Sequence, residues 1–223
     1  MSFKLFIGAI LKLLLGVVLV GALIFLPAGD LGFIRGWVLM GILFIPMLIA
    51  GIVMMIKNPE LLERRLDAKE KMADQSVVIK LSGLMFIGGF VLSGLGHRFG
   101  WLTIPLGVSI GAAILFLLSY LLYAEVLREN AYLSRTVKVS EGQRVIDKGL
   151  YGKVRHPMYA ATIPLFLSMP LILGSLWGFL LFLLYPFFIA VRIRGEERFL
   201  EQELEGYTEY KSRVKYRLIP FIW

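Results

Sequence analysis

The chain has 223 residues, of which 58% are hydrophobic and 18% are charged, and its mean hydropathy is +0.77. Soluble domains are nearer half apolar and a quarter charged, so this composition excludes an ordinary soluble domain, and its many apolar and aromatic residues exclude a disordered chain. With no cysteine and two histidines, the sequence excludes disulfides and offers too few ligands for a thiolate or multi-histidine metal centre. The formal net charge of +8 comes from basic residues mixed with acidic ones between apolar runs, which indicates membrane topology rather than nucleic-acid binding. We therefore expect an integral membrane protein that lies in a lipid bilayer and binds neither nucleic acid nor metal.

Six apolar runs predict about six membrane helices, since a bilayer core about 30 Å thick needs roughly 20 helical residues. The runs cover residues 5–26, 36–56, 77–95, 101–124, 157–173 and 176–191. The last two are short for a span and are separated by Gly174 and Ser175, which predicts a C-terminal helical hairpin that is tilted or partly embedded. The expected fold class is therefore all-α and polytopic.

Charged residues are concentrated in three segments between or after these runs. Residues 57–80, 125–155 and 192–223 together contain twenty lysines and arginines, whereas the opposite connections have Arg35 and Arg98 as their basic residues. Because basic residues mark cytoplasmic loops, the three segments and the N-terminus are expected in the cytoplasm. This topology makes the protein multi-pass with both termini cytoplasmic.

Two features inside the apolar runs are expected to be structural. Lys12 interrupts the first run, and we expect its side chain to extend along the helix to the cytoplasmic interface. Gly107 and Gly111 have the four-residue spacing of small residues that favours close packing between membrane helices.

A dense polar segment comes directly before the predicted hairpin. It contains a short extended stretch over residues 142–149 and then the sequence Arg155-His-Pro-Met-Tyr159. Pro157 suits the first turn of a helix, whose free backbone N–H groups leave an electropositive end. His156 and Tyr159 are three residues apart, so both side chains are expected on the face over this helix start. The alternative is a simple membrane boundary, with the arginine and histidine as interfacial charges and the tyrosine as part of an aromatic belt.

A second polar segment follows the last apolar run. Arg192 and Glu196 are four residues apart, which predicts that they lie one turn apart on a helix that continues out of the membrane. Leu200, Leu204 and Tyr207 form an apolar stripe that is expected to pack down on the membrane face.

These polar segments resemble the isoprenylcysteine carboxyl methyltransferase family, and most closely its prokaryotic branch. The resemblance lies in Arg155-His-Pro-x-Tyr159, Glu196-Glu197-x-x-Leu200 and Gly206-Tyr-x-x-Tyr210-x-x-Arg213-Val with Pro220-Phe-Ile, and it extends upstream to Lys57–Arg65, His97–Trp101 and Glu129–Asn130. It implies a membrane enzyme of a prokaryotic cell with a cytoplasmic cofactor pocket. We therefore divide the chain into four membrane helices in residues 1–124 and a catalytic region in residues 125–223, which holds the hairpin and a cytoplasmic C-terminal helix.

The resemblance also implies a cofactor and the residues that hold it. The cofactor is S-adenosylmethionine, with S-adenosylhomocysteine as the product. The implied pocket residues are Gln143, Arg144, Val145, Ile146, Tyr151, His156, Pro157, Met158, Tyr159 and Glu196. Glu196 would accept hydrogen bonds from the ribose or the amino acid part of the cofactor. Arg192 would meet the reacting group of the acceptor as the catalytic residue, and Asn130 would also bind the acceptor.

Methyl transfer from a sulfonium is an in-line displacement that depends on positioning more than on acid or base catalysis. A carboxylate acceptor is already a nucleophile, and Arg192 can hold it in a bidentate fork. The rings of Tyr151 and Tyr159 can face the sulfonium cation. The expected reaction is methylation of a lipophilic acceptor, such as the carboxylate of an isoprenylcysteine or an analogue.

Three alternatives remain at the level of sequence. An amine acceptor, as in phospholipid N-methyltransferases, would need a general base and a phosphate-binding pair. An NADPH-dependent sterol or enone reductase has a similar Arg-His-Pro-x-Tyr segment, although such enzymes tend to be longer. A non-catalytic membrane scaffold is the third alternative, and the clustered polar residues argue against it.

Overall fold

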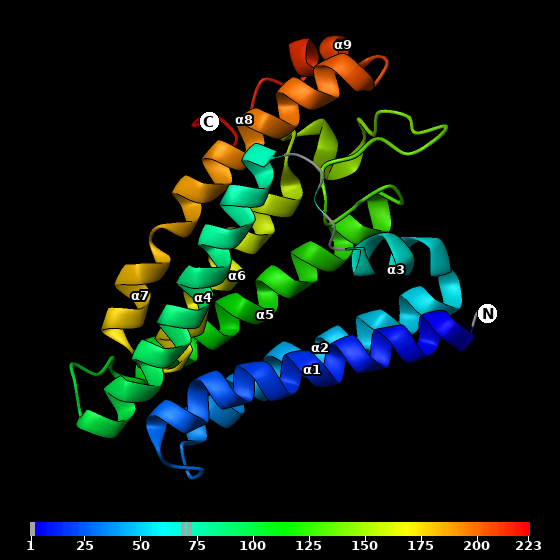
Figure 1. The fold of residues 1–223 in the computed structure, drawn as a ribbon. Coiled ribbons are helices and arrows are strands. Elements are labelled where there is room, and N and C mark those ends of the chain that lie inside the picture. The colour runs from blue at the N-terminus through cyan, green and yellow to red at the C-terminus, as the bar shows by residue number, and fades with distance from the viewer. Residues whose placement is uncertain (1–2, 68–69, 71–72) are drawn as a thin grey trace.

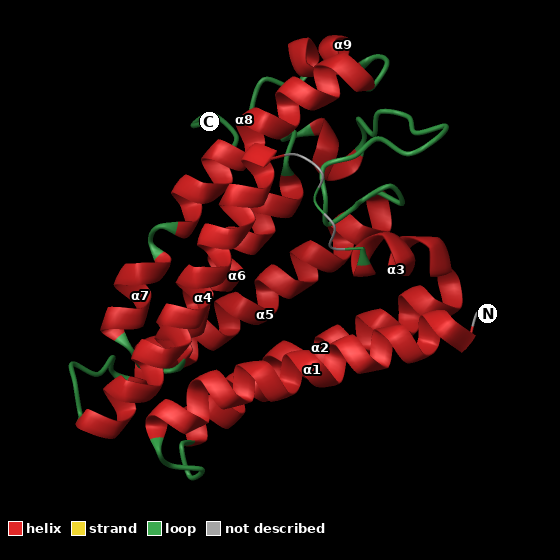
Figure 2. Cartoon of the chain, viewed as in Figure 1, coloured by secondary structure: helices red, strands yellow, loops and turns green. Residues whose placement is uncertain are grey.

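The computed structural model describes residues 3–67, 70 and 73–223, and the arrangement of the chain is shown in Figure 1. In these residues the regular structure is helical throughout, apart from an isolated bridge between Thr103 and Ser175 (Figure 2). The elements are α1 Phe3–Ala28, α2 Ile34–Lys57, α3 Pro59–Leu66, α4 Ala73–Phe99, α5 Leu106–Glu129, the 3-10 turn η1 Gly149–Gly152, α6 Pro157–Ile172, α7 Leu176–Phe182, α8 Tyr185–Glu203 and α9 Tyr207–Arg213.

Five helical stretches are long and apolar enough to cross a membrane. They are α1, α2, α4, α5 and the 28-residue stretch Leu176–Glu203, which contains α7 and α8. The shorter α6, with 16 residues, is the first arm of the hairpin. The all-α, polytopic fold class is therefore confirmed for the described residues. The second arm is longer than the expected 176–191, and its length of about 42 Å carries its C-terminal turns beyond a hydrocarbon core of about 30 Å.

The break between α7 and α8 has a local cause in Pro186. Proline has no backbone N–H and its ring crowds the preceding turn, so the helix is interrupted before it and restarts with Pro186 in the first turn of α8. At the other end of α7, the Ser175 hydroxyl accepts a hydrogen bond from the Gly178 N–H at 3.0 Å. This N-cap fixes the hairpin turn where the sequence predicts it.

The helices form an antiparallel α1–α2 pair and a bundle of α4, α6, α7 and α8, with α5 crossing between them (Figure 1). Gly94 brings α4 close to α1, because a Cβ at this position would lie 2.5 Å from the carbonyl oxygen of Ile24. No atom of the described chain lies within 4 Å of the position that a Cβ would take at Gly107 or Gly111. The expected packing role of these two glycines is therefore wrong within the chain. Instead α5 packs on α6, where the Ser109 hydroxyl donates to the carbonyl oxygen of Leu171 at 2.8 Å.

The turns at residues 29–33, 100–105 and 173–175 gather at one end of the helices. The Ile104 N–H donates to the Gly174 carbonyl at 3.0 Å, and the Arg35 guanidinium donates to the Ile104 carbonyl at 3.1 Å. These bonds tie the α4–α5 and α6–α7 connections to the start of α2.

The three charged segments meet at the opposite end. Lys138 pairs with Asp67 at 2.9 Å, and Arg192 lies 3.7 Å from Glu70, so all three segments contact one another. The Lys12 ammonium donates to the carbonyl oxygen of Leu66 at 2.6 Å, where it caps the C-terminal end of α3. Lys12 therefore extends toward the charged end, as expected, and has a protein partner there. That this end faces the cytoplasm remains a prediction.

Single cysteines can test the topology, since the natural sequence contains none. Ser212 is exposed at the charged end and Leu31 is 73% exposed at the other. In intact cells, an impermeant thiol reagent should label Leu31→Cys and should label Ser212→Cys after the membrane is permeabilised. Labelling of Ser212→Cys from outside the intact cell would show that the charged end faces outward and that the predicted topology is wrong.

Candidate active site

A pocket that is open to solvent and has a cavity volume of about 100 Å³ lies at the charged end of the molecule. Its walls come from the loop after α5, the turn η1, the start of α6, the end of α8 and α9. All ten residues implied for the cofactor line it: Gln143, Arg144, Val145, Ile146, Tyr151, His156, Pro157, Met158, Tyr159 and Glu196. Asn130 lines it as well. Arg192 is 8% exposed and lies behind the pocket wall.

Tyr151 is fixed from both sides of its turn. Gly149 has a φ of +60°, and a side chain there would collide with the Glu129 carboxylate, which accepts a hydrogen bond from the Leu150 N–H at 2.9 Å. The Tyr151 hydroxyl accepts a hydrogen bond from the Asn130 amide at 2.9 Å. Burial raises the pKa of Tyr151, so its hydroxyl stays protonated at neutral pH and keeps a donor.

The Asn130 amide is engaged in holding this wall together. Its nitrogen donates to Tyr151, and its oxygen accepts from the Tyr132 N–H at 3.0 Å. The side chain therefore organises the turn after α5, and its predicted contact with the acceptor stays a prediction.

The start of α6 is built as the sequence predicts. The helix begins at Pro157, and the rings of His156 and Tyr159 stack with centroids 5.7 Å apart. The backbone before it is paired with the C-terminal segment, because the N–H groups of Arg155 and His156 donate to the carbonyls of Tyr216 and Arg217, both at 2.9 Å. The pocket wall and the C-terminal segment therefore form one unit.

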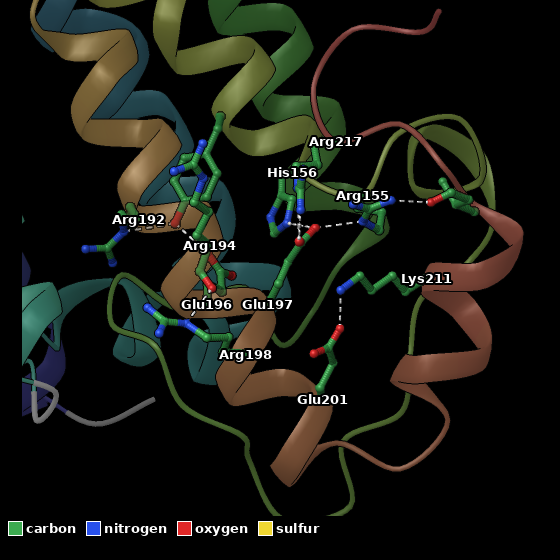
Figure 3. Close-up of polar contacts among 12 residues, drawn as sticks. Arg155, His156, Arg192, Arg194, Glu196, Glu197, Arg198, Glu201, Lys211 and Arg217 are labelled. Carbon is green, nitrogen blue, oxygen red and sulfur yellow. Dashed lines mark hydrogen bonds and ion pairs between the residues drawn. The ribbon is translucent and has the colours of Figure 1, made fainter. Parts of the chain in front are cut away.

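Glu197 is the centre of a buried ionic cluster at this junction. Its side chain is 3% exposed, and one carboxylate oxygen lies 2.7 Å from Arg155 Nε and 3.3 Å from His156 Nε2. The other oxygen lies 2.9 Å from an Arg217 nitrogen. In Figure 3 the three side chains converge on this carboxylate, while Arg192 extends from the other side of α8.

The alternative interpretation, in which Arg155 and His156 are charges at a membrane interface, is wrong. Both residues are buried, at 6% and 5% exposed, because Glu197 neutralises Arg155 and is hydrogen-bonded to both side chains. Sequence reasoning named Glu197 in the motif Glu196-Glu197-x-x-Leu200 but gave it no role. Two adjacent carboxylates on a helix point in different directions, so only one of them can face the pocket.

The Tyr159 hydroxyl joins Glu196 and Arg192. It donates to Glu196 Oε2 at 2.7 Å and accepts from Arg192 Nε at 2.9 Å, and Tyr159 itself is 4% exposed. A second Arg192 nitrogen donates to the Arg135 carbonyl at 2.9 Å. Glu196 therefore faces the pocket and Arg192 faces away from it, with the tyrosine hydroxyl between them.

The loop before η1 forms the outer wall. Gln143 Oε1 accepts from the Ser140 N–H at 2.9 Å, so this amide closes the loop. Val145 packs in a cluster with Leu204 and Tyr207, and both of these line the pocket. The expectation that their stripe packs down on the membrane is therefore wrong, because its buried face meets this loop.

Tyr207 contributes the observation that best tests whether a ligand fits. Its hydroxyl is buried without a hydrogen-bond partner among the described residues, in a side chain that lines the pocket. Burial raises the pKa of Tyr207, and the carboxylates of Glu197 and Glu196 raise it further, so the hydroxyl remains a donor. A buried donor without a partner is costly, and a polar ligand in the pocket would satisfy it. The lining therefore fits a ligand with hydrogen-bond acceptors, such as the ribose or carboxylate of S-adenosylmethionine.

Sequence reasoning missed about half of the lining. The additional residues are Tyr132, Leu133, Ser134, Thr136, Val137, Lys138, Arg155, Leu200, Leu204, Tyr207 and Tyr210. Leu200, Tyr207 and Tyr210 stand in the segments that carry the resemblance, so a signal for them was present. Residues 132–138 have no motif, and their place in the pocket follows from the fold.

Removing the charge of Glu197 should destabilise the protein strongly. Glu197→Gln leaves the buried Arg155 and the partly buried Arg217 without this carboxylate, and breaking a buried ion pair costs about 3–5 kcal/mol. Glu201→Gln is the matched control, because this exposed residue of α8 has Lys211 as its one ionic partner among the described residues. This variant should lose less than about 1 kcal/mol. Unfolding of the purified protein in detergent measures both, and equal losses would contradict the structural role of the cluster.

Comparison with known proteins adds independent information on this region. Residues 108–205 match the model of the phospholipid methyltransferase family, a range that extends from α5 to the end of α8 and includes Tyr159, Arg192 and Glu196. A segment of 91 residues, 40% of this chain, is 30% identical to the Delta(14)-sterol reductase TM7SF2 of Mus musculus and spans 22% of the length of that protein. The family match covers less than half of the chain and lies on elements that form the pocket, and the described residues include helices long enough to span a bilayer.

Proposed function

We propose that the protein transfers a methyl group from S-adenosylmethionine to the carboxylate of a lipophilic acceptor, such as an isoprenylcysteine or an analogue. One observation carries this proposal: the Tyr159 hydroxyl bridges Glu196 on the pocket side and Arg192 on the far side. A donor held in the pocket and an acceptor held at Arg192 would meet at this tyrosine. The polar donor would enter from water and the acceptor from the bilayer.

The pocket residues have properties that suit this donor. When bound, S-adenosylmethionine supplies a methyl group on a sulfonium sulfur, and the electron pair of the broken methyl–sulfur bond stays on sulfur as the acceptor oxygen forms its bond to carbon. Glu196 can accept hydrogen bonds from hydroxyl or ammonium groups, and Tyr207 can donate one. The Tyr151 and Tyr159 rings can lie against the positive charge, a contact worth about 0.5–2 kcal/mol.

Arg192 is suited to orient the acceptor. Its guanidinium is held by Tyr159, by the Arg135 carbonyl and by Glu70, so its direction is fixed before the acceptor arrives. A carboxylate needs no deprotonation, so orientation and exclusion of water are the main tasks of the site. A positioned guanidinium can perform the first of these.

An amine acceptor is a second candidate, and the match to the phospholipid methyltransferase family favours it. An amine acceptor is protonated at neutral pH and must lose one proton before its nitrogen lone pair can attack the methyl carbon. The Glu196 carboxylate, which accepts a hydrogen bond from the Tyr159 hydroxyl at 2.7 Å, can take up this proton. The same pocket would then serve both reactions.

The segment shared with the sterol reductase favours a third candidate, hydride transfer from NADPH. Thermal unfolding of the purified protein in detergent separates the two donors. S-adenosylhomocysteine at 100 times its Kd should add about 2.7 kcal/mol of stability, and NADPH should add none. Stabilisation by NADPH but not by S-adenosylhomocysteine would indicate a reductase rather than a methyltransferase.

Loss of the Tyr207 hydroxyl should weaken binding of the donor. Tyr207→Phe removes the donor that has no protein partner, so we expect an affinity for S-adenosylhomocysteine about 10-fold lower, with normal folding. Tyr216→Phe is the control, because this half-buried tyrosine lies outside the pocket. Calorimetric affinities equal to the parent value in Tyr207→Phe would place the ligand elsewhere.

Arg192→Lys should separate orientation from charge. Lysine keeps the charge but loses the planar fork, so turnover should fall about 100-fold, as for a misplacement of about 1 Å. The affinity for S-adenosylhomocysteine should stay near the parent value. The same substitution at the exposed Arg194, two residues further along α8, should leave turnover unchanged. The assay follows labelled methyl groups from the donor into a lipid extract, and parental turnover in Arg192→Lys would disprove its role.

A further inference from the structure

A group of basic residues lies on the Arg192 side of Tyr159, outside the pocket described above. Arg65, at the end of α3, stacks on the Tyr123 ring with its guanidinium carbon 5.5 Å from the ring centre, and it donates to the Tyr123 hydroxyl. Another of its nitrogens lies 4.0 Å from the sulfur of Met158, the residue before Tyr159. Arg65 therefore reaches from α3 to the start of α6.

Arg65 has two positively charged neighbours at this point. The Arg135 carbonyl accepts a hydrogen bond from Arg192, and the guanidinium of Arg135 is close enough to Arg65 and Arg192 to be affected by both charges. Arg135 is an exposed residue, yet loss of solvent around its guanidinium lowers its pKa, and the like charges of Arg65 and Arg192 lower it further. Arg192 contacts Tyr159 and Arg65 contacts Tyr123 and Met158, and the Arg135 guanidinium lies within electrostatic range of both arginines.

The partners of Arg65 do not neutralise it. Within the described residues, no carboxylate lies within ion-pair distance of Arg65 or Arg135, while Arg192 has Glu70 at 3.7 Å. A phenol and a thioether are weak partners for a guanidinium, which has five N–H donors. Three guanidiniums with one carboxylate, Glu70, among them leave an excess of positive charge that favours a bound anion, and a planar guanidinium binds carboxylate and phosphate oxygens in pairs.

We propose that α3 contributes to the acceptor site, and that Arg65 binds an oxyanion in the head group of a lipid acceptor together with Arg192 and Arg135. This proposal rests on the proposed function, because it places the acceptor on the side of Tyr159 opposite the donor pocket. For a carboxylate acceptor the bound anion is the nucleophile itself. For an amine acceptor it is the phosphate next to the amine. Arg65 would in both cases select acceptors that carry an oxyanion.

Lipid binding in detergent tests this without any turnover. The thermal stability of the full chain is measured with increasing mole fractions of dioleoyl phosphatidic acid, oleate or dioleoylglycerol in the micelle, and separately with inorganic phosphate. The two anionic lipids should stabilise the parent protein, and the uncharged dioleoylglycerol should not. Stabilisation by phosphatidic acid alone or by oleate alone would identify the oxyanion as phosphate or carboxylate.

Three variants identify the residue. Arg65→Gln should raise the half-saturating mole fraction of the anionic lipid about 10- to 100-fold, the effect of losing a hydrogen bond to a charged group. Tyr123→Phe keeps the charge of Arg65 but frees its side chain, so we expect a smaller rise. Arg128→Gln is the control, because it also removes one positive charge, five residues after Tyr123 at the C-terminal end of α5. Arg128 pairs with Glu125 and its side chain is 72% exposed, so this variant should behave as the parent.

Several outcomes would overturn the proposal. They are an unchanged half-saturating fraction in Arg65→Gln, equal stabilisation of the parent by dioleoylglycerol, or stabilisation by inorganic phosphate as strong as that by phosphatidic acid. Stabilisation by S-adenosylhomocysteine is recorded for each protein in parallel. A parent that responds to anionic lipid but not to S-adenosylhomocysteine would contradict the donor pocket and leave the lipid site standing, so the two failures are distinguishable.

Discussion

The ionic cluster around Glu197 holds together the parts of the chain that form the pocket. One carboxylate neutralises Arg155 and Arg217 and contacts His156, and these residues come from the start of α6, the middle of α8 and the C-terminal segment. A buried charge is tolerated only when it is paired, so these three parts of the chain must meet at one point. The stack of His156 on Tyr159 then depends on the same contact.

Tyr159 converts this arrangement into a two-sided site. Its hydroxyl is bonded to Glu196 on the pocket side and to Arg192 on the other side. The carboxylate and the guanidinium hold that hydroxyl in one orientation, with one donor and one acceptor role assigned. A donor and an acceptor bound on the two sides of this hydroxyl would have to meet past the edge of the ring, because methyl transfer needs the reacting atoms about 3–3.5 Å apart.

Much of the fold could be predicted from composition and apolar length, because spans such as α2 and α5 have the length that a bilayer core needs. The start of α6 was also predictable, since Pro157 and the spacing of His156 and Tyr159 act locally. The role of Glu197 was not predictable, because its partners Arg155 and Arg217 are remote in sequence and only the fold brings them together. The stripe containing Tyr207 was assigned to the membrane for the same reason: an apolar helix face does not reveal which surface will cover it.

The order of these contacts along the chain has a consequence for how the protein is made. Arg217 follows every membrane helix, and it is one of the cations that close the Glu197 cluster. During synthesis the helices can enter the bilayer one after another, each with its backbone hydrogen bonds satisfied internally. The pocket, in contrast, can form only after Arg217 has left the ribosome and folded back onto α8. Membrane insertion and the ability to bind a ligand are therefore separated in time within a single polypeptide.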